Sequence, residues 1–134
     1  MLDLRLRLAS TADAERLFIW RNDPATRAQS RNTEPVAWND HIAWLTRRLE
    51  RDDPALYIAE VEGTPVATLR LDGDEVSYTV SPERRGQGVA SALLELARTR
   101  FGVLRAGIKP ENEASIRAAE KAGHTVVLLP ASTP

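Results

Sequence analysis

The segment Val80–Ala90 constrains the fold of this chain most strongly, because a strand-like run there meets a glycine-containing turn and then an apolar helical run. Gly86 and Gly88 stand one residue apart, and Arg84 and Arg85 precede them. The first amides of a helix have no partner within the helix, and the helix dipole places partial positive charge behind them. Glycine lets an anion approach such amides closely. The segment therefore predicts a phosphate-binding loop at the start of a helix.

Three kinds of phosphate-binding loop can be compared with this segment. A triphosphate-binding loop needs lysine and then serine or threonine after its last glycine, and no lysine follows Gly88. A dinucleotide-binding loop needs a third glycine, but Ser91 stands in that place and the preceding strand comes late in the chain. The third pattern, Arg/Gln-x-x-Gly-x-Gly/Ala, is filled by Arg85, Gly88 and Ala90. An ordinary glycine turn before a helix is the alternative for these residues alone.

Filled in this way, the segment resembles the loop of the GCN5-related N-acetyltransferase (GNAT) superfamily that binds the pyrophosphate of acyl-coenzyme A. A second stretch follows in the right order, since Pro110–His124 is similar to the superfamily's "N-x-x-S … E-K-x-G-F" helix. Asn112 suits the N-cap of this helix, and Gly123 suits the residue after its end. A well-capped surface helix would explain Asn112 and Gly123 equally well. Each motif is weak by itself, and the two together indicate the superfamily.

The resemblance implies acetyl-CoA as cosubstrate and suggests which residues bind it. Val80 is the expected main-chain donor nearest the thioester, on a fourth strand that splays from the fifth. In the family, the asparagine that matches Asn112 hydrogen-bonds the pantetheine arm, and the serine that matches Ser115 lies near the cofactor. The other expected cofactor-binding residues form the loop and the first helical turn: Arg85, Gly86, Gln87, Gly88, Val89 and Ala90.

Composition excludes several other classes of function. The 134 residues suit one domain, which we expect to span residues 1–134. The 18 basic and 19 acidic residues nearly balance, so charge favours neither nucleic acid nor a membrane surface as partner. Cysteine is absent, and the two histidines, His41 and His124, lie far apart, so we expect no disulfide and no metal. Without a signal sequence or a long apolar run, a cytoplasmic protein is expected.

Apolar spacing and turn residues predict the element order βααβββαβαβ. Strands are expected at 2–8, 56–61, 65–71, 75–81, 103–108 and 125–129, and helices at about 10–21, 38–51, 89–101 and 112–122. Residues 25–36 read as a polar loop, and the tail 130–134 is expected to fray. The residue pairs between the three middle strands suit tight hairpin turns.

This order agrees with the superfamily's fold, which is a single α/β domain with a mixed, mostly antiparallel sheet and splayed fourth and fifth strands. Many relatives have two final strands, whereas only one is predicted here, over 125–129. The second strand often helps to wall the acceptor site in the family. A homodimer partner could complete that wall.

Acetyl transfer to an amine needs a polarised thioester carbonyl and a neutral amine held close to it. At pH 7 a lysine-like amine with a pKa near 10.4 is neutral in about one molecule in 2,500. A positioned base would contribute roughly 10²–10⁴ in rate. Glu75 is the first candidate, directly or through water, because many relatives place an acidic residue at the start of the fourth strand. Glu75 also follows an Asp-Gly turn, where solvated carboxylates are common.

His41 is the second candidate for a chemical role, because imidazole titrates near neutrality and His41 stands one helical turn from Trp44. A histidine in such a place more often packs against its neighbours. As for a general acid, many relatives carry a tyrosine seven residues after the helix asparagine, where this chain has Ala119. Tyr78 or water could protonate the leaving thiolate instead. We expect that no acid is needed, since a thiol with a pKa near 8.5 leaves readily.

The stretches Trp20–Asp23 and His41–Leu45 resemble the "W-R-N … H-x-x-W/F" pattern of acetyltransferases that act on nucleotide-linked amino sugars, and of the ribosomal N-terminal branch. Trp20 and Trp44 could stack on a sugar or base, while Arg21 and Arg27 could hold a phosphate or carboxylate. Tryptophans on amphipathic helices are more often core residues, however, and Arg21 could pair with an acidic neighbour.

The sequence thus predicts an acetyl-CoA-dependent N-acetyltransferase that acts on the primary amine of a small molecule, with an amino sugar as one candidate. Two alternatives stay open. One is a protein N-terminal acetyltransferase of the ribosomal-protein kind, and the other is a non-catalytic domain that keeps the fold and binds coenzyme A or a protein partner.

Overall fold

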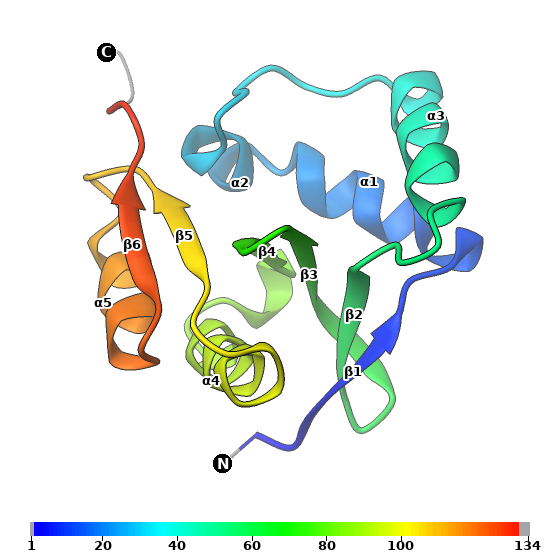
Figure 1. The fold of residues 1–134 in the computed structure, drawn as a ribbon. Coiled ribbons are helices and arrows are strands. Elements are labelled where there is room, and N and C mark those ends of the chain that lie inside the picture. Colours follow the sequence, from blue (N-terminus) through cyan, green and yellow to red (C-terminus); the bar gives the residue numbers. More distant parts are fainter. Residues whose placement is uncertain (1, 132–134) are drawn as a thin grey trace.

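Six strands form one sheet in the order β1-β2-β3-β4-β5-β6, and helices cover both of its faces (Figure 1). The computed structural model describes residues 2–131, so residues 132–134 of the expected frayed tail lie outside the described residues. The strands are β1 (Leu4–Leu8), β2 (Leu56–Val61), β3 (Thr64–Asp72), β4 (Glu75–Val80), β5 (Arg105–Ile108) and β6 (Thr125–Leu128). Pairing is antiparallel from β1 to β4 and parallel from β4 to β6. The predicted α/β fold with a mostly antiparallel sheet is confirmed.

The helices follow the predicted order, with one addition. They are α1 (Ala14–Asn22), α2 (Pro24–Gln29), α3 (Trp38–Leu49), α4 (Val89–Phe101) and α5 (Glu113–Lys121), and the short 3-10 turns are η1 (Thr11–Asp13) and η2 (Pro82–Arg84). Helix α4 coincides with the helix predicted over 89–101.

Helix α2 is the addition, and it shows that the prediction of a polar loop over 25–36 is wrong at its start. Asp23 Oδ2 accepts a hydrogen bond from Thr26 N at 3.1 Å, and Pro24 takes the first helical position. An aspartate followed by proline begins a helix as readily as it ends the one before. The segment 22–24 therefore ends α1 and begins α2.

Two clusters of buried side chains attach the helices to opposite faces of the sheet. Helices α4 and α5 pack on one face through a cluster that includes Leu69 and Leu93. Helices α1 and α3 pack on the other face through a smaller cluster that includes Leu45 and Ile58. Each such fully buried side chain contributes roughly 1.5–3 kcal/mol. Within residues 2–131, no helix has the length and apolar character that crossing a membrane requires.

Strands β4 and β5 separate soon after they begin. Their pairing is limited to Glu75 with Arg105 and Val76 with Ala106, although β4 continues to Val80. The predicted splay is confirmed. Since the two strands are parallel, the gap opens toward their carboxyl ends, from which the chain leads into the first turns of α4 and α5. Both helix N-termini therefore face the same opening in the sheet.

Two-residue turns join β2 to β3 and β3 to β4, as predicted. Val61 pairs with Thr64 across the first hairpin, and Asp72 pairs with Glu75 across the second. The second hairpin brings Glu75 back beside the end of β3. It also determines which backbone amides of β4 point toward β3 and which point into the gap.

Candidate active site

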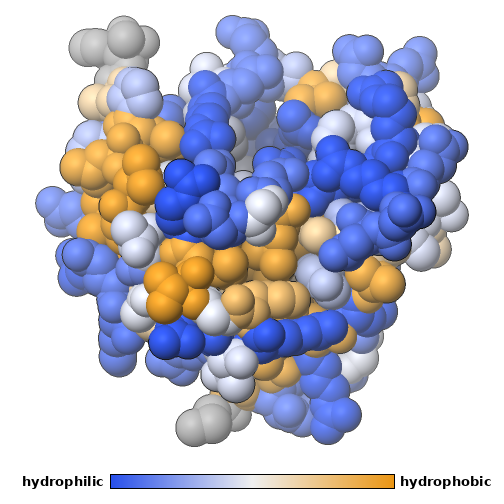
Figure 2. All heavy atoms as spheres, in the orientation of Figure 1, coloured by the Kyte–Doolittle hydropathy of each residue, from blue (hydrophilic) through white to orange (hydrophobic). Residues whose placement is uncertain are grey.

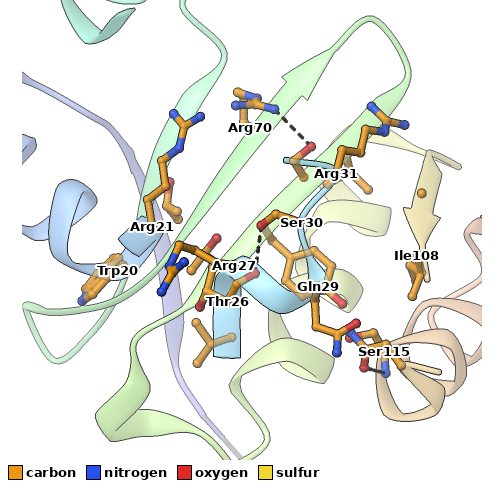
Figure 3. A pocket seen from close by; sticks show the side chains of 18 of the residues that line it. Trp20, Arg21, Thr26, Arg27, Gln29, Ser30, Arg31, Arg70, Ile108 and Ser115 are labelled. Atoms are coloured by element: carbon orange, nitrogen blue, oxygen red, sulfur yellow. Dashed lines mark hydrogen bonds between the residues drawn. The ribbon is translucent and has the colours of Figure 1, made fainter. Parts of the chain in front are cut away.

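A cleft of about 710 Å³ occupies the gap between β4 and β5 and extends under α1, α2 and α3. Figure 2 shows this face hollowed in its upper middle, with hydrophilic side chains around the opening. Ala90 in the first turn of α4 and Ser115 in the first turn of α5 line the cleft at one end. Arg21 and Arg70 line it at the other end (Figure 3), together with Trp44, whose ring lies beside both guanidinium groups.

The glycine loop leaves backbone amides free at the start of α4. Gly88 is the N-cap residue, with φ 81°, and Gly86 has φ 75°. Such left-handed conformations favour glycine, and an added Cβ at either position would meet no atom within 4 Å. The first intrahelical bond runs from Ala92 N to Gly88 O at 3.1 Å, so the amides of residues 89–91 have no acceptor within the helix. The loop thus has two glycines with positive φ and, after them, helix amides that lack an acceptor within the helix.

The polar side chains of this loop are engaged with the protein itself. Arg85 donates to the Asp23 carboxylate and to Thr26 Oγ1, the latter at 2.9 Å, and so ties the loop to the start of α2. The hydrogen bond from Arg85 is the main cause that lowers the pKa of Asp23. Gln87 Nε2 donates to Glu83 O at 3.3 Å. Binding of a phosphate at this loop would therefore rely on backbone amides.

The pairing of β4 with β3 decides which amides face the cleft. Ser81 N donates to Val66 O at 2.8 Å, which makes Thr79, Ser77 and Glu75 the residues whose amides point toward β3. The amides of Tyr78 and Val80 point the other way, into the gap that β5 has left. Sequence analysis predicts the Val80 amide from the family resemblance. It misses the Tyr78 amide, which the alternation of the strand would have indicated.

The start of α5 and the ring of Tyr78 form the wall beside the gap. Asn112 Oδ1 accepts a hydrogen bond from Ser115 N at 3.4 Å, so the asparagine caps α5 as predicted. The buried Tyr78 hydroxyl has no hydrogen-bond partner among residues 2–131. Burial raises the pKa of Tyr78, and the neighbouring Ser115 hydroxyl opposes this to a smaller extent. Ala119 is fully buried in the core, which leaves no room there for the tyrosine that many relatives carry.

Glu75 lines the cleft as half of an ion pair. Arg31 Nη1 lies 2.8 Å from Glu75 Oε1, and the Glu75 side chain is 28% exposed. The Arg31 guanidinium also lies over β5, because its Nη2 would be 3.0 Å from a Cβ added to Gly107. Arg31 thus lies across the gap between β4 and β5. Nothing in the sequence relates Arg31 to Glu75, so this contact was not predicted.

His41 lies at the inner wall of the cleft and is only 1% exposed. Its Nε2 is 2.9 Å from Ala14 O, so this nitrogen donates, and the buried Nδ1 has no partner among the described residues. Burial is the main cause that lowers the pKa of His41, so the ring is neutral at pH 7. The rings of Trp38 and Trp44 lie against it. Any chemical role of His41 would have to use Nδ1.

The four residues expected to contact the acceptor separate into two groups. Trp20 belongs to the buried core at 7% exposure, and Arg27 donates to the carbonyls of Asn22 and Thr33, both at 3.1 Å. Arg21 and Trp44 remain available at the cleft, with the guanidinium 5.7 Å from the ring centroid. Among residues 2–131, no three His, Cys, Asp or Glu side chains gather as metal ligands would.

The chain matches a known family over most of its length. The family described as "Acetyltransferase (GNAT) domain" matches residues 3–125. No curated protein matches the chain.

Solved structures with the same fold include several N-acetyltransferases. The ribosomal-protein-alanine N-acetyltransferase from Brucella melitensis is 31% identical, with a TM-score of 0.66, and the match covers 89% of this chain and 83% of that chain. The spermidine N-acetyltransferase from Vibrio cholerae, in complex with CoA and spermine, is 17% identical, with a TM-score of 0.76 and coverage of 90% and 79%. An aminoglycoside acetyltransferase in complex with coenzyme A is 20% identical, with a TM-score of 0.67 and coverage of 90% and 83%. The last two similarities concern the fold alone.

Proposed function

The chain belongs to the GNAT acetyltransferase family, and from that premise we propose that it moves the acetyl group of acetyl-CoA directly to the primary amine of a small molecule. Membership of the family makes it an acyltransferase. The observation that supports the proposal is the set of free amides at the start of α4, where Ala90 lines the same cleft as the unpaired strand β4. Gln87 and Gly88 lie just outside this cleft, in a smaller hollow that Ser91 also lines. We propose that the diphosphate binds at this helix start and that the thioester carbonyl lies farther in.

At the donor end, the amides of residues 86–90 would bind the diphosphate, with the dipole of α4 adding partial positive charge. The amides of Tyr78 and Val80 would bind the pantetheine arm and polarise the carbonyl. Asn112 and Ser115 border the same part of the cleft. Acetyl-CoA, when bound, supplies an activated acyl group, so the remaining task of the protein is to position the amine and remove its proton.

At the acceptor end, Glu75 is the proposed base. Its carboxylate lies at the beginning of the gap, on the face of β4 that also carries Ser77 and Thr79. Keeping a lysine-like amine neutral at pH 7 costs roughly 4.6 kcal/mol, and a base in reach of the amine, directly or through one water, offsets part of this. His41 is the less favoured base, because its only free nitrogen is buried between aromatic rings.

Tyr78 is the proposed acid for the leaving thiolate. A tyrosine hydroxyl is protonated at neutral pH, and that of Tyr78 lies beside the Ser115 hydroxyl without a hydrogen bond of normal geometry among residues 2–131. This goes beyond the expectation from sequence that no acid is needed. A mechanism with Tyr78 as acid and a mechanism without an acid differ in one measurable quantity. This quantity is the change in kcat when the Tyr78 hydroxyl is removed.

An amino sugar is the favoured acceptor, and a protein N-terminus is the second candidate. The cleft of about 710 Å³ has the volume to hold a small molecule, and Trp44 offers one partly exposed ring at its acceptor end. The 31% identity to a ribosomal-protein-alanine N-acetyltransferase is the specific observation that favours the second candidate. Release of thiol with a panel of amino sugars and short peptides separates the two.

Calorimetry with acetyl-CoA tests the donor end. We expect Gly88→Glu to abolish binding, because the substitution places bulk and negative charge where the diphosphate would lie. Gly63→Glu is the matched control, since Gly63 also has a positive φ and nothing near its Cβ, but stands in the β2–β3 turn. Gln87→Glu adds the charge without the backbone strain and should weaken binding as well. Equal binding by wild type, Gly88→Glu and Gln87→Glu would remove the loop from the proposal.

A cytoplasmic homodimer is the last part of the proposal. Strand β6 forms one edge of the sheet, and Val127 and Leu128 are exposed there at 44% and 60%. Figure 2 shows hydrophobic side chains gathered along that side of the molecule. A second copy of this chain that covers β6 would bury them. Light scattering of the purified chain, with Leu128→Lys as the disrupting variant, tests this.

A further inference from the structure

Two arginines from different elements converge on one tryptophan at the acceptor end of the cleft. The Arg21 guanidinium, from α1, lies 5.7 Å from the centroid of the Trp44 ring, and the Arg70 guanidinium, from β3, lies 5.8 Å from it. Figure 3 shows the two guanidinium groups at the same end of the cleft, with Arg31 farther along beside β5. Two like charges therefore share one aromatic ring.

The two arginines differ in how their charges are balanced. Arg70 donates to Asp72 Oδ2 at 2.9 Å and to Ser77 Oγ at 3.5 Å. Arg21 has no carboxylate within 4.0 Å among residues 2–131. Partial burial lowers the pKa of Arg21, and the charge of Arg70 lowers it further, although the Arg21 side chain keeps contact with solvent at the mouth of the cleft. Arg21 thus lies beside a second cation without a carboxylate partner of its own among the described residues.

The other arginines of the cleft have partners within the protein. Arg27 binds backbone carbonyls, Arg31 pairs with Glu75, and Arg85 pairs with Asp23. Among the described residues, the lining of the cleft includes these three arginines, the pair at Trp44 and two acidic residues, Glu34 and Glu75. Asp23 and Asp72 offset the charges of Arg85 and Arg70 from outside the lining, so the remaining excess is at Arg21 and Arg27. An excess of positive charge disfavours an acceptor with several amino groups and attracts an anion.

We propose that the acceptor is an amine that also carries an oxyanion group, a phosphate or a carboxylate, held between Arg21 and Arg70 and against Trp44. Guanidinium groups bind such oxyanions through paired, charge-assisted hydrogen bonds. The anion would balance the charge of Arg21 and relieve its repulsion with Arg70. This inference rests on the proposed function, because it describes the molecule that the transferase would acetylate.

The register of the sheet adds a constraint on the length of that molecule. Arg70 pairs with Ser77 across β3 and β4, and Glu75 stands two residues farther along β4 on the same face. Two residues of a strand span roughly 7 Å. We take this backbone separation as a guide to the spacing of the anion and the amine, and an amino-sugar phosphate or an ω-amino acid offers such a spacing.

Steady-state kinetics with matched amines test the inference. The pairs are glucosamine 6-phosphate against glucosamine, and 4-aminobutyrate against 4-aminobutanol, with spermidine as the polycation. In at least one of the two pairs, we expect the KM of the wild type to be roughly tenfold lower for the anionic amine than for its neutral partner, as charge-assisted hydrogen bonds imply. The pair with the larger difference in KM shows whether the site prefers a phosphate or a carboxylate. Equal use of anionic and neutral partners, or a preference for spermidine, would overturn the inference.

Variants assign the preference to the two arginines. Arg21→Gln should raise the KM for the preferred anionic amine roughly tenfold. Arg70→Gln is the second variant. It does not leave the Asp72 carboxylate without a partner, because Arg48 Nη1 donates to Asp72 Oδ1 at 2.6 Å. Arg47→Gln removes an exposed charge from α3 outside the cleft and should change nothing. An equal rise in KM for neutral amines, or a rise in KM for acetyl-CoA, would contradict the assignment.

A binding measurement separates failure of this inference from failure of the proposed function. If no amine is acetylated, glucosamine 6-phosphate and 4-aminobutyrate are titrated into protein saturated with CoA, and tryptophan fluorescence is followed. Binding that Arg21→Gln weakens at least roughly tenfold would support the anion site even though the chain does not catalyse transfer. Absence of binding, or binding that Arg21→Gln does not change, would overturn it.

Discussion

Arg31 Nη1 lies 2.8 Å from Glu75 Oε1, so the proposed base stands in the cleft already paired with a cation. The Arg31 side chain is 60% exposed, and an ion pair so open to solvent contributes at most about 1 kcal/mol. Arg31 can therefore leave Glu75 at little cost when an acceptor amine approaches. The pair holds the carboxylate at the entrance of the gap.

Glu75→Gln should lower kcat by roughly 10²–10⁴ if the carboxylate accepts the proton of the amine. The amide keeps the size of the side chain and loses its basicity, so KM for acetyl-CoA should stay the same. A pH–rate profile of wild type and variant checks this, with thiol release as the assay. A rate near that of the wild type, with the same limbs of the profile, would exclude Glu75 from proton transfer.

Arg31→Gln should raise kcat/KM for a neutral amine up to about fivefold, because the carboxylate no longer has to exchange one partner for another. The exposed Arg5, which pairs only with Asp3 at 3.6 Å and lies outside the cleft, gives the matched control Arg5→Gln. A fall in kcat/KM for Arg31→Gln would mean that the guanidinium positions Glu75 for the reaction.

Tyr78→Phe should lower kcat roughly 10–100-fold while leaving the free energy of unfolding unchanged or slightly higher. The stability argument follows from the hydroxyl, which is buried and has no hydrogen-bond partner among residues 2–131, so its loss removes a desolvation cost. Chemical denaturation and kinetics on one preparation give both quantities. An unchanged kcat would return the mechanism to a thiolate that leaves without an acid.

Asp13→Asn should lower the free energy of unfolding at pH 7 by about 3 kcal/mol, because it removes one partner from a buried ion-pair network. Asp13 is fully buried and accepts two hydrogen bonds from Arg7, both at 2.8 Å, and one from Ser10 N at 2.9 Å. Burial alone would raise the pKa of Asp13, but the bonds from Arg7 and Ser10 outweigh it and lower the pKa.

The lowered pKa gives this prediction a pH dependence. The stabilisation by Asp13 is present above the ordinary pKa of an aspartate and is lost as the pH falls through the lowered value. Wild type and Asp13→Asn should therefore converge in acid. Urea unfolding at neutral and acidic pH checks this, with the exposed Asp3→Asn as control. A constant difference at all pH values would show that packing, and not charge, accounts for the loss.

Local signals in the sequence account for the parts of the site that were predicted. Gly86 and Gly88 mark the loop because a left-handed backbone at a helix start favours glycine. Asn112 marks the cap of α5 because capping depends on residues three apart in the chain. The Asp-Pro pair at 23–24 shows the limit of such signals, since the same two residues can end one helix and begin another.

The parts that were missed depend on contacts between distant segments. Arg31 reaches Glu75, and Arg70 joins Arg21 at Trp44, only because α1, α2 and α3 fold over one face of the sheet. No local pattern distinguishes these arginines from the many others in the chain. Arg27, which the sequence favours as an anion ligand, binds carbonyls of its own loop instead.

His41 gives the last prediction, a loss of stability between pH 7 and pH 5. Burial, with a smaller contribution from Arg21, lowers the pKa of His41 below its ordinary value of 6.5. As the pH falls through 6.5, the unfolded chain binds a proton that the folded chain does not, so the free energy of unfolding decreases, by at most about 1.4 kcal/mol per pH unit. His41→Gln does not titrate and keeps an N–H that can reach Ala14 O, so its stability should change less over this range. The difference between the two curves isolates His41 from His124, which is also buried. Parallel curves for wild type and His41→Gln would show that the ring takes up its proton in the folded state, and would make Nδ1 a candidate for proton transfer in the cleft.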